Sequence, residues 1–256
     1  MLAVFKREFK AYFSNPLGFI VLAAIFFFLG LGFYQIFGAG APYMEYVVLF
    51  PVQVLFLIIP VITMRLFSDE RRTKTDQVLF TAPVKLINIV MGKFLASFTL
   101  YVIGFLPTVI YQIIISSFLK SADASAKVHV YYYIYALVGV LLFGAALIAI
   151  GMFISSLSES PIISIIFTLI INLFIMSAGS FAGLINVPSK TDTFFQAIGA
   201  FLLKLLSKFL NGMNFTQVLD SFNNQAFAVK DVIYFISITI AFIFLTERSL
   251  EKRRWS

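Results

Sequence analysis

A dense run of charge between two long apolar segments constrains this chain more than any other feature of its sequence. Acidic and basic residues are concentrated in residues 65–83, whereas residues 47–64 before the run and residues 91–118 after it are mostly apolar. Each charged side chain at the centre of a bilayer costs about 2.5–3.5 kcal/mol of insertion free energy. The charged run must therefore lie in water, between two segments that cross a membrane.

The composition extends this interpretation to the whole chain. Of its 256 residues, 61% are hydrophobic and 12% are charged, whereas globular domains are about 45–50% apolar and about 25% charged. We therefore expect an all-α integral membrane protein with a single transmembrane domain over residues 1–256. A net charge of +7 would suggest nucleic-acid binding in a soluble protein. Here it indicates topology instead, because Lys and Arg collect in cytoplasmic loops.

Six apolar segments are long enough to be transmembrane helices. The first has 21 residues, or roughly 31 Å at the helical rise, which is about one hydrocarbon core. Pro51 and Pro60 predict kinks in the second span, and Gly144 and Gly151 in the fourth predict close helix packing. The expected spans are residues 17–37, 47–64, 92–118, 132–154, 162–184 and 231–245.

Two regions outside the spans also have helical patterns. Residues 1–15 repeat apolar side chains at helical spacing and place most of their charges on another face, which predicts an amphipathic helix in the membrane interface. Residues 186–230 form the longest region between spans, and they contain an apolar helix at residues 194–210. Such a helix is typical of an interfacial or re-entrant segment. Residues 246–256 are expected to form a charged tail.

The distribution of cations predicts the orientation. With six spans, both termini and the charged run share one side of the membrane, and that side holds thirteen of the nineteen Lys and Arg residues. The positive-inside rule then places both termini and residues 65–90 in the cytoplasm.

The charged run has the signals of a short helix, expected over residues 68–80. Ser68 is a candidate N-cap, Asp69 and Glu70 fill the first turn, and Pro83 marks the end. A short charged helix on the surface of a membrane protein is a natural place for a soluble partner to bind.

The sequence carries no pattern of an enzyme. It has no Gly-rich phosphate-binding loop, and His129 has no neighbouring metal ligands along the chain, so we expect no catalytic residue, metal or cofactor. The spans contain almost no ionisable residues, which disfavours ion-coupled transport. Gln53 and Asn172 are expected to be buried polar groups, either joining helices or lining a path for a substrate.

The segment around the charged run resembles one family. Residues 63–84 read Thr-Met-Arg-Leu-Phe-Ser-Asp-Glu-Arg-Arg-Thr-Lys-Thr-Asp-Gln-Val-Leu-Phe-Thr-Ala-Pro-Val, and Met-Gly-Lys follows at residues 91–93. This resembles the ABC-2 family of ABC transporter permeases, as does the end of the fourth span at residues 151–160. Thr75 and Asp76 match the family pattern, but Lys74 stands where the family usually has Gly. We expect a slightly different turn there.

The resemblance implies partners and a role for the charged helix. It implies a separate ABC ATP-binding subunit, a second permease half that is a copy or a relative, and a place among the lipids of the bacterial inner membrane. Residues 68–80 would be the coupling helix, with Gln53 and Asn172 as candidates for the path. The residues expected to contact the ATP-binding subunit are Ser68, Asp69, Glu70, Arg71, Arg72, Lys74, Thr75 and Asp76.

The two ends of the chain resemble one group of permeases within this family. Residues 5–16 and 246–256 resemble the permease subunit associated with bacterial gliding motility, and permeases of copper-enzyme maturation are similar. The alternative is a membrane scaffold that transports nothing and anchors a periplasmic partner through residues 186–230, with the ATPase as a motor.

Overall fold

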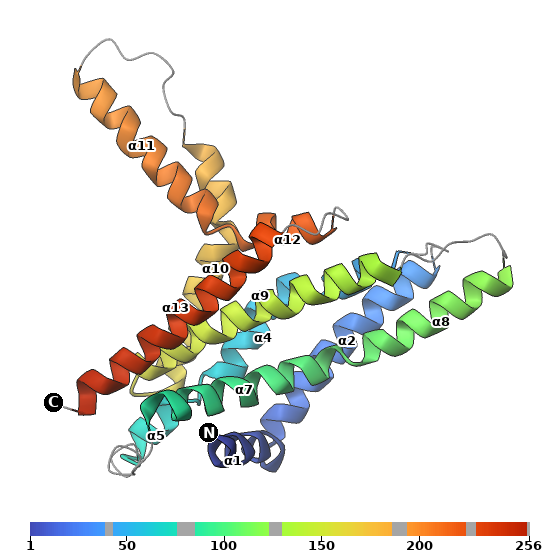
Figure 1. The fold of residues 1–256 in the computed structure, drawn as a ribbon, viewed down its shortest axis with the longest axis horizontal. Helices are drawn as coiled ribbons and strands as arrows, with labels where there is room; N and C mark the ends of the chain where they lie inside the picture. Colours follow the sequence, from blue (N-terminus) through green and yellow to red (C-terminus); the bar gives the residue numbers. More distant parts are fainter. Residues whose placement is uncertain (39–42, 76–84, 123–129, 186–193, 224–228, 255–256) are drawn as a thin grey trace.

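The computed structural model describes residues 1–38, 43–75, 85–122, 130–185, 194–223 and 229–254, and within these ranges the chain forms helices and no strands (Figure 1). The predicted all-α fold is therefore confirmed. The helices are α1 (Leu2–Ser14), α2 (Pro16–Gly38), α3 (Met44–Leu49), α4 (Val52–Thr63), α5 (Ser68–Arg72), α7 (Leu86–Phe105), α8 (Pro107–Ala122), α9 (Val130–Leu157), α10 (Pro161–Leu184), α11 (Phe194–Gly212), α12 (Phe215–Asn223) and α13 (Val229–Arg254).

Six helical stretches of the described residues are long and apolar enough to cross a membrane, which confirms the predicted number of spans. They are Pro16–Gly38, Met44–Arg72, Leu86–Phe118, Val130–Leu157, Pro161–Leu184 and Val229–Arg254. The charged C-terminal stretch differs from the expected tail, because α13 continues as a helix to Arg254. Glu, Lys and Arg are good helix formers, and Arg248 pairs with Glu251 one turn later, with 2.5 Å between Nη1 and Oε2.

Prolines interrupt two of these stretches. The helix stops before Pro51 and again before Pro107, because proline has no amide hydrogen and its ring clashes with the preceding turn. Pro60 instead stays inside α4. It leaves the carbonyl of Phe56 without its usual helical donor, and Asn172 of α10 supplies one, with Nδ2 3.0 Å from that oxygen. A polar side chain from a neighbouring helix thus stabilises the proline within the span.

Helix α9 lies at the centre of the bundle, and its glycines admit side chains from three neighbours. A Cβ at Gly144 would lie 2.3 Å from the ring of Tyr101 in α7, and a Cβ at Gly151 would lie 2.3 Å from Oγ1 of Thr63 in α4. At Gly139 a Cβ would lie 2.7 Å from the ring of Phe222 in α12. The expected close packing of the fourth span is therefore present.

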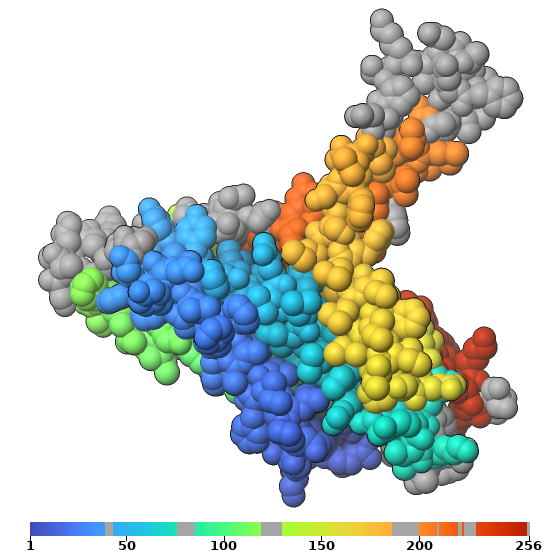
Figure 2. Space-filling view, turned by 180° about the vertical axis from the view of Figure 1, so that it is seen from behind, coloured from blue at the N-terminus to red at the C-terminus, as the bar shows by residue number. Residues whose placement is uncertain are grey.

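Helices α10 and α11 form an arm that leaves the bundle. Figures 1 and 2 show α10 (yellow) continuing away from the other spans, with α11 (orange) lying along its far half. Helix α11 exposes large apolar side chains, including Phe201 and Leu202 at 60% and 58%. The following α12 turns back and buries Phe215 and Phe222 against α9. The segment that returns to the bundle is therefore α12, residues 215–223. It follows in sequence the helix predicted to be interfacial or re-entrant, residues 194–210.

Both ends of the chain lie at the same end of the bundle as α5 (Figure 1). The predicted grouping of the charged segments on one side therefore agrees with the arrangement of the helices. This end carries α5, the helix that the sequence predicts to bind a partner.

Candidate functional site

The N-cap of helix α5 lies one residue before the predicted one. Ser68 does not cap the helix: Phe67 holds the N-cap position, and Oγ of Ser68 donates to the carbonyl of Met64. The backbone amides at the start of the helix donate to a side chain of another helix. The backbone N–H groups of Phe67 and Ser68 donate to Oγ of Ser155 in α9, at 3.1 and 3.3 Å. A distant serine thus satisfies the donors that a helix leaves at its first turn.

The helix ends at Arg72, well before the predicted stop at Pro83, which lies outside the described residues. The amide of Lys74 bonds to the carbonyl of Arg71 at 3.1 Å, and that of Thr75 to the carbonyl of Glu70 at 2.9 Å. This is the Schellman pattern, which needs a left-handed residue after the C-cap. Lys74 takes that conformation with φ of 56°. Lys74 thus adopts the backbone that glycine favours, and the expectation of a turn different from the family's stays a prediction.

A buried lysine holds the inner face of α5. Lys93 in α7 is 1% exposed, and its Nζ lies 2.9 Å from Oε1 of Glu70 and 3.1 Å from Oε1 of Glu8 in α1. The same ammonium donates to the carbonyl of Leu66 at 2.5 Å and lies over the ring of Phe67. Because a charge buried without partners is strongly unfavourable, these contacts explain why Lys93 tolerates its position.

Arg7 closes the cluster from the outside. Its Nη2 lies 2.6 Å from Oε1 of Glu8 and 2.8 Å from Oε1 of Glu70. Burial alone would lower the pKa of Arg7, but the hydrogen bonds and negative charges of both carboxylates raise it above its usual value. We call Arg7, Glu8, Glu70 and Lys93 the charge cluster. It joins α1, α5 and α7.

Two further contacts seat α1 on the bundle beside the charge cluster. The hydroxyl of Tyr12 donates to the carbonyl of Ile62 at 2.8 Å and lies 3.0 Å from Oγ of Ser97. Gly92 leaves room for Val4, since a Cβ there would lie 3.0 Å from Cβ of Val4. The Gly-Lys pair at residues 92–93 therefore serves two purposes: the glycine allows α1 to approach, and the lysine binds it.

Arg71 fastens α5 to a third part of the bundle, the turn after α9. Its Nη1 donates to the carbonyl of Leu157 at 2.6 Å, and its Nη2 lies 2.5 Å from Oε1 of Glu159. Helix α5 is thus held at its start by Ser155, on its inner face by the charge cluster and at its end by this turn.

The predicted partner-binding residues therefore divide into two sets. Ser68, Glu70 and Arg71 face the protein and hold α5 in place. The exposed set comprises Arg72, Lys74 and Thr75, with Asp69 partly exposed and paired to Arg65 and Arg72 at 3.7 and 3.5 Å. We call Asp69, Arg72, Lys74 and Thr75 the outer patch. Asp76 lies outside the described residues.

The two candidates for a path do not face a common space within the chain. Asn172 is buried and donates to α4, as described above. Gln53 is exposed, so its predicted burial is wrong. It lies on the same face of α4 as Leu57, one turn later and 51% exposed. That face is turned away from the helices that cover the rest of α4.

Lys93 and Glu8 are functional candidates that reasoning from the sequence missed. In the sequence, Lys93 is one of the cations that predict the orientation and the last residue of the Met-Gly-Lys motif. Its position inside an apolar segment that was itself predicted to begin at residue 92 was a usable signal, because an ionisable group within a span usually has a partner and a role.

Comparison with known families gives one result. The family model described as ABC-2 family transporter protein matches residues 41–248, a range that includes α5, Lys93 and the arm but not α1. A search of curated proteins finds no match to the chain.

Proposed function

The chain belongs to the ABC-2 family of transporter proteins, and from this premise we propose that α5 is the coupling helix through which a separate ATP-binding subunit drives the spans. The chain is a multi-pass membrane protein and the permease component of an ABC transporter. The family implies an ABC ATP-binding partner in general terms. The finer proposal concerns where that partner binds and how its movement is passed on.

One observation supports the proposal: contacts within the chain hold α5 on three sides, whereas the side chains of the outer patch remain accessible to a partner. A push on the outer patch moves Glu70 and Arg71, and these residues are bound to α1, α7 and the turn after α9. Because Lys93 is buried, its ion pairs with Glu8 and Glu70 are screened little by solvent. A displacement of α5 is therefore shared with α1 and with the spans that contain α7 and α9, which is what coupling requires.

Within this proposal, the predicted contact residues have different roles. Asp69, Arg72, Lys74 and Thr75 contact the ATP-binding subunit, since they are the accessible ones. Ser68, Glu70 and Arg71 are positioning residues, since their side chains are engaged within the chain.

The remaining parts of the proposal concern orientation and the second half of the transporter. The cations of α1, α5 and the end of α13 support a cytoplasmic location for this end of the bundle, in a bacterial inner membrane. A second permease half, either a copy or a related chain, covers the face of α4 that bears Gln53 and Leu57. A path for the substrate then runs along that face, and Asn172 contributes to it only by stabilising α4.

The biological setting is supported only by the sequence. The likeness of residues 5–16 and 246–256 to the gliding-motility permease supports a role in that machinery, while export by a general or copper-enzyme maturation permease is the alternative. A scaffold that transports nothing is favoured by one feature, the arm of α10 and α11, which offers a surface for a periplasmic partner outside the bundle (Figure 1).

The test is to purify the full-length chain from its native membrane in mild detergent and to measure what is bound to it. We expect an ABC ATP-binding subunit at one copy per permease, in a complex with two permease chains. The double variant Arg72→Glu, Lys74→Glu should retain several-fold less of that subunit, because it reverses the charge of the outer patch.

The matched control is Lys252→Glu, which reverses an exposed cation at the same end of the bundle, in α13. It should retain as much ATP-binding subunit as the unaltered chain. Equal loss in both variants would show an effect of net charge, and no loss in either would exclude the outer patch as the contact.

A further inference from the structure

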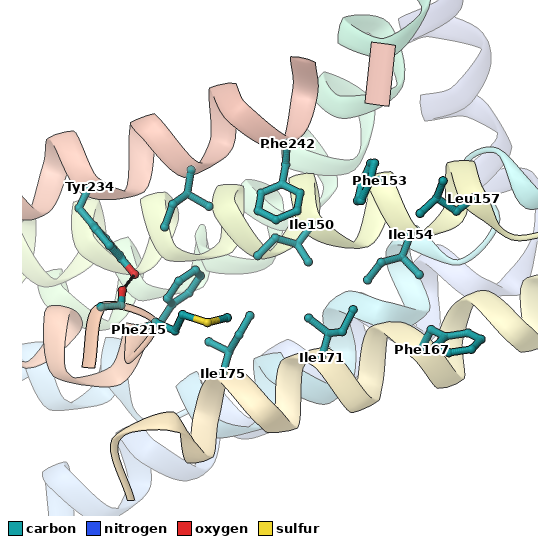
Figure 3. A pocket seen from close by; sticks show the side chains of 13 residues that line it. Ile150, Phe153, Ile154, Leu157, Phe167, Ile171, Ile175, Phe215, Tyr234 and Phe242 are labelled. Carbon is teal, nitrogen blue, oxygen red and sulfur yellow. Dashed lines mark hydrogen bonds between the residues drawn. The ribbon is translucent and has the colours of Figure 1, made fainter. Parts of the chain in front are cut away.

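A hollow of about 600 Å³ lies between α9, α10, α13 and the start of α12 (Figure 3). Its lining is apolar, with Leu157 and Phe167 at one end and Phe215 and Tyr234 at the other. The hydroxyl of Tyr234, the one polar side-chain group in this lining, donates to the carbonyl of Gly212. The hollow therefore offers a ligand no free hydrogen-bonding side chain, which suits hydrocarbon and disfavours a polar molecule.

The hollow has the depth of one membrane leaflet. Along α13 it extends from Tyr234 to Phe242, or about 12 Å at the helical rise, whereas half of a hydrocarbon core is about 15 Å. Its open end lies beside α5, because the carbonyl of Leu157 accepts the hydrogen bond from Arg71. Leu157 and Phe167 are 52% and 54% exposed, so this end is open to the surroundings of the bundle. The hollow thus opens in the leaflet on the side of α5.

The size of the hollow selects among apolar occupants. A helix is about 10–12 Å across. An extended hydrocarbon chain is much thinner, and the hollow falls within the usual volume of small-ligand sites, about 300–1,000 Å³. The hollow therefore has the volume and the apolar lining that an acyl chain requires.

The charge beyond the open end indicates which lipid is preferred. The last turn of α13 is basic, with Lys252, Arg253 and Arg254, and Arg71 lies next to Leu157. Cations at the membrane surface attract anionic lipid headgroups. We propose that the hollow is a binding site for one acyl chain of an anionic phospholipid, from the leaflet on the side of α5. This proposal does not depend on how the ATP-binding subunit is coupled.

The test uses the full-length chain in lipid nanodiscs and a phosphatidylglycerol that carries a photoreactive diazirine in one acyl chain. After irradiation, the labelled residues are located by mass spectrometry. We expect labelling within residues 150–157 and 234–242, and several-fold less labelling in Ile238→Trp, because the larger ring fills the hollow. Ile171→Trp fills it from the opposite wall and serves the same purpose if the first variant does not fold.

The matched control is Ile240→Trp, which changes a residue of the same helix that is 62% exposed and outside the lining. It should leave labelling of the hollow unchanged. Labelling that is insensitive to Ile238→Trp, or a disulfide between two copies that carry Phe167→Cys, would overturn the proposal. Equal labelling by the matching phosphatidylcholine probe would overturn the preference for an anionic lipid.

Discussion

The charged end of the bundle and the arm at the opposite side use their side chains in contrasting ways. At the charged end, Lys93 is almost fully buried and contacts two carboxylates, one from α1 and one from α5. On the arm, Lys204 and Phe201 of α11 are both exposed. The buried charge of the first region finds its partners within the chain, whereas the second region leaves apolar side chains exposed.

This difference indicates which region depends on its surroundings for its arrangement. Membrane helices gain little from burying apolar groups against each other, because lipid is equally apolar, so polar contacts and close packing specify their arrangement. The charge cluster and the glycines of α9 provide both within the chain. Among the side chains of α11 that the structure describes, most of the large apolar ones are exposed, so the position of the arm is expected to depend on lipid or on another protein.

The largest expected effect is an all-or-none difference in accessibility between the two regions. The chain has no cysteine, so single cysteines can be placed at the exposed positions Lys74 and Lys204. In intact cells, a membrane-impermeant maleimide should label K204C and should label K74C only after the membrane is opened. The unaltered chain is the blank. Labelling of K74C in intact cells would reverse the proposed orientation.

The second effect is a loss of stability that is confined to the charged end. Lys93→Met leaves Glu8 and Glu70 without their buried cation, which should cost about 3–5 kcal/mol. Lys204→Met makes the same change at an exposed position of the arm, where about 0.5 kcal/mol or less is expected. The measurement is the unfolding midpoint of each purified variant in detergent.

A compensating variant separates the loss of charge balance from the loss of packing. Adding Glu8→Gln and Glu70→Gln to Lys93→Met removes the carboxylates that have lost their buried cation and should recover part of the lost stability. If Lys93→Met and Lys204→Met melted at the same temperature, the charge cluster would have no role in holding α5.

The smallest of the three effects compares the packing of the two regions. Gly144→Leu places a side chain against the ring of Tyr101 and should cost about 1–3 kcal/mol through overpacking. Gly183→Leu makes the same change near the end of α10, where no described atom lies within 4 Å of an added Cβ. It should be neutral or slightly stabilising, because leucine is the better helix former. The same midpoints measure both, and equal destabilisation would contradict the contrast.

Much of the fold could be predicted from the sequence because hydropathy and proline act locally. The six spans follow from segment length, since each must cover the hydrocarbon core. The break at Pro51 follows from the missing amide hydrogen. The grouping of α1, α5 and the C-terminus at one end follows from the even number of spans (Figure 1).

The roles of individual polar residues were decided only by the tertiary structure. Glu70 and Arg72 are both charged residues of the same short helix, yet Glu70 contacts a lysine of α7 and Arg72 faces outward. Asn172 binds a carbonyl that Pro60 leaves free in another helix, and Gln53 lies on an uncovered face. No local pattern distinguishes these pairs.

The physical reason is the separation of the partners along the chain. Lys93 and Glu8 are 85 residues apart, and Arg71 and Leu157 are 86 residues apart. By itself, the sequence determined which segments enter the membrane and which remain in water, because each segment meets the bilayer as an independent unit. The burial of Lys93 was settled only when the helices packed, because its counter-charges come from α1 and α5.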